Sequence, residues 1–152
     1  MQMNTDGDKI AASILSLERG ALDRWGKGDV EGYLEIYADD VSYFDPITVA
    51  RIDGLSAVAD YIRPWAGKIR VPRYEIVNPQ VVTDRNVAVL SYNLVNYIHT
   101  ADGSETVGTR WNSTQVYRRT DDQWRVVHVH WSFTRHPAFA NLSPEDTKEM
   151  TA

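Results

Sequence analysis

The sequence predicts one α+β domain in which helices come first and a long antiparallel sheet follows. Two changes along the chain support this prediction. Up to about residue 65, apolar side chains recur at three- and four-residue spacing, which is the period of an amphipathic helix. From residue 73 to residue 134, the chain is rich in Val, Tyr, Trp, Thr and Ile, and short turn-like breaks divide it. No helix-length polar segment separates the resulting strands, so we expect them to pair antiparallel.

The first half of the chain should contain three helices and one short strand. The predicted elements are a helix at residues 8–25, a helix at 29–38, a strand at 41–45, a loop at 46–54 and a helix at 55–65. Gly26 and Gly28 end the first helix, and Asp29 suits the N-cap of the second. Pro46 ends the short strand because proline cannot donate a backbone hydrogen bond to a neighbouring strand.

The second half should contain four long strands. They are predicted at residues 73–83, 86–100, 105–119 and 123–134. A bent sheet that helices close on one side encloses a cone, and its mouth is the natural place for a ligand. The strand at 86–100 fits two registers, and a shift of one residue reverses which face is buried. One register turns Asn93 and Tyr97 toward the cone, and the other turns Tyr92 and Asn96.

Composition excludes several classes of function. The length fits a single domain over residues 1–152, with a core at about 8–136 and a polar tail at 137–152. The absence of cysteine excludes disulfides, thiolate nucleophiles and zinc sites built on sulfur. A net charge of -5 argues against binding to nucleic acid or to anionic membranes. No secretory signal and no apolar run of ~20 residues is present, so we expect a cytoplasmic protein without a membrane span.

The order of elements resembles the nuclear-transport-factor-like, or SnoaL-like, superfamily over about residues 8–136. The run WRVVHVH at 124–130 is similar to the last strand of the association (hub) domain of calcium/calmodulin-dependent protein kinase II. The pairs at 28–29 and 78–79 also match that domain. The segment that ends in Asp45-Pro46 resembles the general-base region of ketosteroid isomerase. The resemblance implies a cystatin-like cone, a fold that hosts enzymes, transport factors and oligomerisation modules, so it does not name a reaction.

The sequence also departs from both relatives. Hub domains line their pocket with arginines, and at the corresponding positions this chain has Gln115 and Trp131. The resemblance therefore implies no clamp for a carboxylate ligand. The two oxyanion donors of the isomerase correspond to about Ala21 and Thr114, which cannot replace a tyrosine and a protonated aspartate. The resemblance implies a general base without its usual partners.

Asp45 is the candidate catalytic residue. It shares one face of the short predicted strand with Val41 and Tyr43, because side chains alternate along a strand. A partly desolvated carboxylate on the wall of the cone can take a proton from carbon or from water. The alternative is that Asp45 opens a turn, since aspartate before proline is common there. The sequence leaves both interpretations open.

Aromatic side chains and the third long strand supply the predicted ligand site. The chain has five tryptophans and eight tyrosines, whose large apolar bodies suit pocket walls as well as the core. The residues predicted to contact a ligand are Trp25, Tyr37, Tyr43, Trp65, Trp111, Ser113, Gln115, Tyr117 and Trp131. Core packing is the alternative role for the aromatic residues of the helices. Ser113 and Gln115 would supply neutral hydrogen bonds, which favours a small, neutral or weakly polar ligand.

The last strand has two histidines, His128 and His130, that share a face. No third ligand stands out, so we predict no metal site, and the absence of a phosphate-loop motif predicts no cofactor. Val127, Val129, Trp131 and Phe133 are expected to line the cone, which turns the histidines and Val126 outward. The residues predicted at an interface between subunits are Asn112, Thr114, Val116, His128 and His130. We expect a homodimer, the commonest closed assembly.

Two functions remain open on the sequence alone. The first is a domain that binds a small molecule in the conical pocket and associates with itself. The second is a cofactor-independent isomerase, cyclase or hydrolase in which Asp45 acts as the general base.

Overall fold

Helices precede the long strands, as the sequence predicts. The computed structural model describes residues 5–134 and residue 143, so the predicted polar tail lies almost wholly outside the described residues. The elements are α1 (Asp6–Trp25), α2 (Glu31–Leu34), β1 (Tyr37–Phe44), β2 (Ile52–Asp53), α3 (Leu55–Ile62), the 3-10 turn η1 (Arg63–Trp65), β3 (Arg73–Asp84), β4 (Val87–His99), β5 (Glu105–Thr120) and β6 (Gln123–Phe133). Among the described helices, none is long and apolar enough to cross a membrane.

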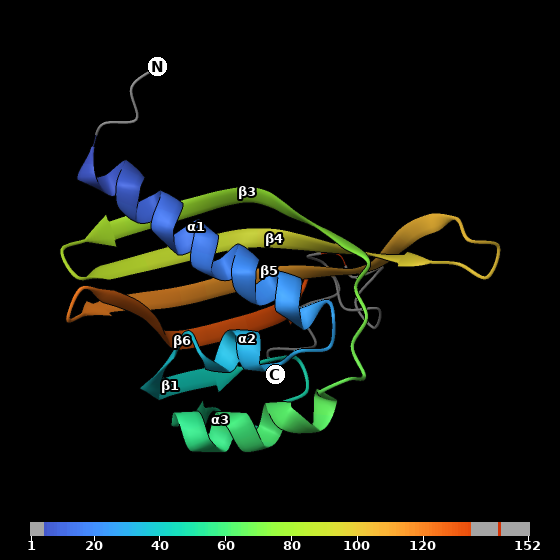
Figure 1. The fold of residues 1–152 in the computed structure, drawn as a ribbon, viewed down its shortest axis with the longest axis horizontal. Coiled ribbons are helices and arrows are strands. Elements are labelled where there is room, and N and C mark those ends of the chain that lie inside the picture. The colour runs from blue at the N-terminus through green and yellow to red at the C-terminus, as the bar shows by residue number, and fades with distance from the viewer. Residues whose placement is uncertain (1–4, 135–142, 144–152) are drawn as a thin grey trace.

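The six strands form one curled sheet in the order β2-β1-β6-β5-β4-β3. Figure 1 shows α1 lying across one face of this sheet, with α2 and α3 beside β1. The strands from β3 to β6 pair antiparallel, as predicted. However, β1 runs parallel to β6, so the prediction of an entirely antiparallel sheet was wrong. Between β1 and β6 the chain passes through β2, α3, η1 and the strands β3 to β5, which supplies the long connection that a parallel pair requires.

The sequence sets both ends of α1. Thr5 caps its start by accepting a hydrogen bond from the Asp8 amide at 3.2 Å, and two aspartates in the first turn favour the helix dipole. Beyond its end, Gly28 has a φ of 85°, which an L side chain adopts only with strain. A Cβ atom at Gly28 would also lie 2.5 Å from Nη1 of Arg70. The predicted helix at 8–25 is confirmed to within two residues.

The second predicted helix is wrong in its length. Only Glu31–Leu34 is helical, and Tyr37 and Ala38 already belong to β1. The Val126 amide of β6 donates to the Ile36 carbonyl at 2.8 Å, so pairing with the sheet ends the helical conformation here. The loop predicted at 46–54 likewise contains the short strand β2, which pairs with β1.

The structure resolves the register of β4 in favour of Tyr92 and Asn96 toward the cone. Tyr92 is buried, whereas Asn93 is exposed on the outer face. In β6, His128 pairs with Val116, and Val126 pairs with Tyr117. This irregularity leaves one extra residue in β6, and such a bulge reverses the alternation of side chains. Val126 is consequently fully buried, which corrects the prediction that it faces outward.

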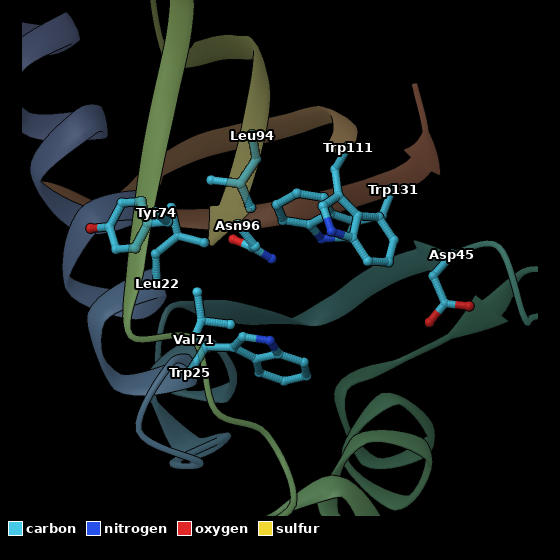
Figure 2. Close-up of a pocket in the computed structure, with 9 residues that line it drawn as sticks. All are labelled: Leu22, Trp25, Asp45, Val71, Tyr74, Leu94, Asn96, Trp111 and Trp131. Atoms are coloured by element: carbon cyan, nitrogen blue, oxygen red, sulfur yellow. The ribbon is translucent and has the colours of Figure 1, made fainter. Parts of the chain in front are cut away.

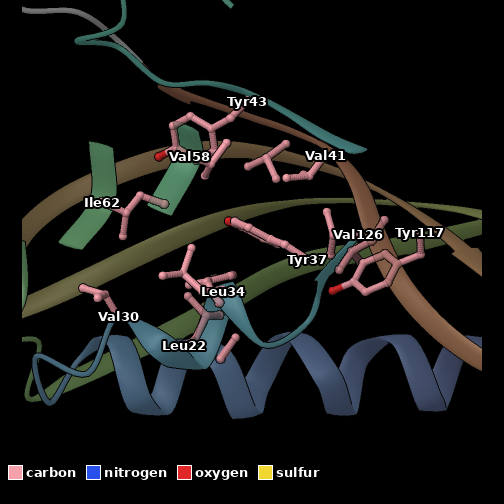
Figure 3. Packing of buried hydrophobic residues seen from close by; sticks show 14 of the residues in the cluster. Leu22, Val30, Leu34, Tyr37, Val41, Tyr43, Val58, Ile62, Tyr117 and Val126 are labelled. Atoms are coloured by element: carbon pink, nitrogen blue, oxygen red, sulfur yellow. The ribbon is translucent and has the colours of Figure 1, made fainter. Parts of the chain in front are cut away.

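The hydrophobic core fills the space between the helices and the concave face of the sheet. Figure 3 shows side chains from the helices meeting those of β1, β5 and β6, including Leu34, Val41, Tyr117 and Val126. Burial of each large aliphatic side chain contributes about 1.5–3 kcal/mol to folding. The core thus closes one end of the cone and leaves the other end for a cavity.

Candidate functional site

A cavity of about 90 Å³ opens at the end of the cone that the core does not fill. It is lined by Leu22, Trp25, Asp45, Val71, Tyr74, Leu94, Asn96, Trp111 and Trp131. Figure 2 shows Trp111 and Trp131 together on one side and Trp25 on another, with the Asp45 carboxylate at one end. None of the nine lining side chains is cationic. The free space is smaller than the roughly 150 Å³ cavity that holds benzene, so it admits a small ring or the end of a larger molecule.

Trp131 is the centre of the aromatic wall. Its ring lies edge-on to Trp111 and Tyr92, with 6.0 Å between ring centres in each pair, and to Tyr33 at 6.5 Å. Edge-to-face contacts of this kind stabilise aromatic pairs beyond their buried area. The indole nitrogen of Trp111 donates to Thr109 Oγ1 at 2.8 Å, which fixes that ring. The rings of Trp111 and Trp131 are therefore held by contacts within the protein.

Asp45 lies at the end of β1 and accepts hydrogen bonds from four groups. Its Oδ1 atom accepts from the amides of Ile47 at 2.8 Å and Thr48 at 3.0 Å, which makes a turn. The hydroxyl of Tyr43 donates to Oδ2 at 3.0 Å, and the hydroxyl of Tyr61 lies 2.8 Å from the same atom. The two interpretations of Asp45 are thus compatible in space, because one carboxylate both opens a turn and lines the cavity.

These contacts limit what Asp45 can do chemically. A carboxylate offers about four lone-pair positions, and four donors already occupy them. Burial, together with Asp45 itself, raises the pKa of both Tyr43 and Tyr61, so the two phenols keep their protons and remain donors. Asp45 can accept a proton from a substrate only after one phenol turns away.

A second carboxylate, Glu18 of α1, is fully buried behind the cavity. It accepts hydrogen bonds from the hydroxyls of Tyr33 at 3.0 Å, Tyr92, and Tyr117 at 2.8 Å. Burial raises the pKa of Glu18, and the three phenol donors oppose that shift. In the part of the chain that the structure describes, Glu18 forms no ion pair with Lys, Arg or His. Glu18 and the three tyrosines thus form a hydrogen-bond network inside the cone.

Sequence reasoning missed Glu18, although a signal was present. Glu18 lies four residues after Ile14 and four before Leu22, so it interrupts the apolar stripe of α1. A glutamate on a face that is otherwise buried requires polar partners. The three tyrosines come from α2, β4 and β5, and no sequence spacing announces that these elements converge.

The structure brings four of the predicted site residues together around the cavity, namely Trp25, Asp45, Trp111 and Trp131. Five others are buried on the cone side without lining the cavity: Tyr37, Tyr43, Ser113, Gln115 and Tyr117. Trp65 does not line the cavity, and it is 43% exposed in η1. Pro64 turns the chain out of α3 there, so the helical spacing that placed Trp65 inward no longer applies.

The predicted interface residues lie on the opposite, outer face of the sheet. Asn112, Thr114 and His130 are exposed, whereas Val116 and His128 are half-buried. Burial lowers the pKa of His128, with a smaller contribution from His130, and its Nδ1 atom lies 2.6 Å from the Ser42 hydroxyl. Within the described part of the chain, no group of three potential ligands could hold a metal ion.

Comparison with known proteins places this fold in a family. Residues 18–136 match the SnoaL-like domain family, and no curated protein matches the chain. A candidate ketosteroid isomerase from Parabacteroides distasonis is 33% identical with a TM-score of 0.72, and the match covers 87% of this chain and 94% of that one. An NTF2-like protein of unknown function from Pseudomonas putida is 25% identical with a TM-score of 0.69, covering 85% and 97%.

The association domain of C. elegans CaMKII has a TM-score of 0.72 at 20% identity, with 85% of this chain and 99% of that one covered. At that identity the similarity concerns the fold alone. The matches confirm the predicted α+β cone and its resemblance to the NTF2-like superfamily. The chain belongs to the SnoaL-like domain family.

Proposed function

We propose that this protein binds a small, neutral, mostly apolar molecule in the cavity at the open end of the cone. The observation that carries the proposal is the composition of the wall, in which three tryptophans surround a few polar groups and no cation. Ligand pockets typically combine an apolar lining with a small number of polar groups that orient the ligand. Asn96 and Asp45 supply such groups here.

The charge of the ligand follows from the same wall. An anion in this cavity would lose its hydration without gaining a basic partner, and it would face the Asp45 carboxylate. A neutral molecule avoids that penalty and buries its apolar surface against the indole rings. The wall therefore disfavours an anion, in agreement with the absence of arginine at the cone-facing positions of β5 and β6, and we propose a neutral ligand.

The test compares cyclohexanone with cyclohexanecarboxylate, which share a ring and differ in charge. We expect cyclohexanone to bind at least tenfold more tightly by isothermal titration calorimetry. A Val71→Trp variant, which fills the cavity, should lose this binding, and Val82→Trp on the exposed side of β3 should keep it. Tighter binding of the carboxylate, or unchanged binding to Val71→Trp, would refute the proposal.

The alternative function is proton abstraction from carbon by Asp45. Its position in the cavity favours this function, as does the 33% identity to a candidate ketosteroid isomerase. The four donors on the carboxylate count against it, because a base needs a free lone pair. The discriminating experiment follows exchange of the α-hydrogens of cyclohexanone for deuterium in D₂O by NMR. Exchange that the protein accelerates and that Asp45→Asn abolishes would establish the alternative, whereas binding without acceleration supports a binding protein.

We also propose self-association through the outer face of β5 and β6. Polar and aliphatic side chains are mixed on this face, with Val116 beside His128 in the sheet register. Sedimentation equilibrium should give the mass of a dimer at micromolar concentration. Val116→Arg should shift the protein to monomer, and Val82→Arg on distant β3 should not. A monomer mass for the unmodified protein at all micromolar concentrations would contradict the proposal.

A further inference from the structure

Three tryptophans line the cavity, and their indole nitrogens differ in their partners. Nε1 of Trp111 donates to Thr109 Oγ1 at 2.8 Å, whereas no hydrogen bond is found in the described residues for Nε1 of Trp25 or Trp131. An indole N–H donates and never accepts, so its role is fixed by its chemistry. The ring of Trp131 is held edge-on by three other aromatic rings, and that of Trp25 has one such contact. Trp25 is therefore the better placed to use its donor on a ligand.

The unpaired nitrogen of Trp25 faces the cavity. Trp25 is half-buried at the end of α1, and its ring lies edge-on to Tyr33, with 5.9 Å between ring centres. Figure 2 shows the nitrogen edge of this ring turned toward the space that Asn96 and Trp111 border on the other side. Within the described ranges, Gln115 Oε1 is the one side-chain polar atom that is both enclosed and unpaired, so the Trp25 nitrogen is in contact with open space. A group in the cavity can therefore reach this donor.

The other polar groups of the wall do not select between ligands in this way. The Asp45 carboxylate already accepts from four donors, and the Tyr74 hydroxyl donates to a carboxylate at 2.6 Å. The Asn96 amide lies 3.3 Å from Thr109 Oγ1, and it can present either its nitrogen or its oxygen to a ligand because the two ends of an amide have the same shape. Trp25 thus offers what these groups do not, a donor without a partner that cannot also accept.

We propose that Nε1 of Trp25 donates a hydrogen bond to an oxygen atom of the bound ligand, which makes Trp25 a specificity-determining residue. This inference rests on the proposed binding function and names its ligand class, a neutral molecule with an acceptor oxygen, such as a ketone, an ester or an ether. The apolar part of the ligand packs against the aromatic wall, and its oxygen lies at the nitrogen edge of Trp25. This hydrogen bond sets the orientation of the ligand in the cavity.

Selectivity follows from what happens to the Trp25 donor when a ligand enters. In aqueous solution, water can accept the hydrogen bond of an accessible indole nitrogen. A hydrocarbon that takes the place of water leaves the nitrogen without a partner, and a protonated amine does the same because it has no lone pair. An acceptor oxygen on the ligand keeps the nitrogen paired. Discrimination of this kind is strong because a buried unpaired polar group is costly in the wrong complex.

The experiment measures dissociation constants for cyclohexanone and methylenecyclohexane by isothermal titration calorimetry. The two rings have nearly the same shape, and only the ketone oxygen accepts a hydrogen bond. Trp25→Phe keeps an aromatic ring and removes the N–H group, so cyclohexanone should lose about tenfold more affinity than methylenecyclohexane. Trp124→Phe is the matched control, because Trp124 is half-buried in β6 and does not line the cavity. It should change neither affinity by more than about twofold.

An NMR spectrum of the unmodified protein tests the same hydrogen bond without a substitution, and it decides the question if Trp25→Phe fails to fold. The five tryptophans give indole N–H signals in ¹H–¹⁵N spectra, and the contact with the Tyr33 ring identifies the signal of Trp25. Cyclohexanone should move this signal downfield, because its oxygen accepts the hydrogen bond. Methylenecyclohexane should not.

Each result distinguishes the inference from the binding function. Equal losses for the two compounds in Trp25→Phe would overturn the inference and leave the binding function intact. A Trp25 signal that cyclohexanone does not move, or a downfield shift at Trp131 instead, would have the same meaning. Selective loss of cyclohexanone in Asn96→Leu and not in Trp25→Phe would assign the oxygen to the amide and also overturn the inference. Failure of both compounds to bind the unmodified protein would overturn the binding function together with the inference.

Discussion

Replacing Glu18 by leucine removes the acceptor on which three buried hydroxyls depend. Tyr33, Tyr92 and Tyr117 each donate to this carboxylate, and all three side chains are buried. Leucine has a similar volume, so the substitution changes polarity more than packing. The phenols cannot reach water without opening the contact between α1 and the sheet. The variant therefore isolates the energetic role of the network.

The magnitude follows from the number of hydroxyls that lose their partner. Each buried polar group without a partner costs about 1–3 kcal/mol, so three phenols give about 3–9 kcal/mol before any relaxation. The leucine variant no longer has to bury a carboxyl group, and this gain offsets part of the cost, since burial is the largest cause of the raised pKa of Glu18. We expect the free energy of unfolding to fall by about 2–5 kcal/mol, a large share of the 5–15 kcal/mol of a typical domain. Glu18→Gln keeps one acceptor oxygen and should cost about 1–2 kcal/mol.

Urea unfolding at pH 6, followed by tryptophan fluorescence, measures these differences. Glu75→Leu is the matched control, because Glu75 is exposed and accepts from a single tyrosine, Tyr97, at 3.0 Å. Its effect should stay within about 0.5 kcal/mol, as for most surface substitutions. If Glu18→Leu and Glu75→Leu were equally stable, the phenol network would contribute nothing to the fold and the reasoning would be refuted.

Three further predictions concern protonation and backbone strain. Because the pKa of Glu18 is raised above 4.5 in the folded state, that state binds the proton more tightly, and stability should fall as pH rises from 4.5 through the folded value. The fall should be absent in Glu18→Gln, and urea titrations at several pH values measure it. The lowered pKa of His128 has the opposite effect on stability. As pH falls through 6.5 toward the folded pKa, the unfolded state binds more protons than the folded state, so the protein loses stability. His128→Gln should reduce that loss. Gly28→Ala should lower stability by about 1–3 kcal/mol because φ is positive and the new Cβ meets Arg70, while Gly20→Ala, with open space around it, should be neutral or stabilising by thermal unfolding.

The sequence was informative wherever local pattern determines structure. The four long strands are predicted to within one residue at each end, because alternation and turn residues mark them directly. The parallel contact of β1 with β6 was not predictable from spacing, since it pairs residues 86 to 89 positions apart. The failure at residues 35–38 has the same origin, because helical pattern there yields to hydrogen bonds with β6.

In the candidate site too, local pattern predicts some residues and not others. Trp111 and Trp131 follow from strand alternation, and both line the cavity. The partners of Asp45 do not follow from it, because Tyr61 comes from α3 and reaches the carboxylate across a loop. Glu18 can be recognised only from its position in an apolar stripe, because a charged residue that becomes buried requires polar partners from other elements of the fold.

The tyrosines explain how an acidic chain keeps carboxylates inside its cone. The sequence has eight tyrosines, and the hydroxyls of seven donate to a carboxylate: Tyr33, Tyr43, Tyr61, Tyr74, Tyr92, Tyr97 and Tyr117. Arginine pairs with acidic residues too, but every ion pair found in the described residues has side chains that are more than one-third exposed. Phenols thus hold Glu18 and Asp45, and the guanidinium groups stay outside. A phenol donates one hydrogen bond and brings no charge. It can therefore stabilise a carboxylate inside the cone without placing a cation there.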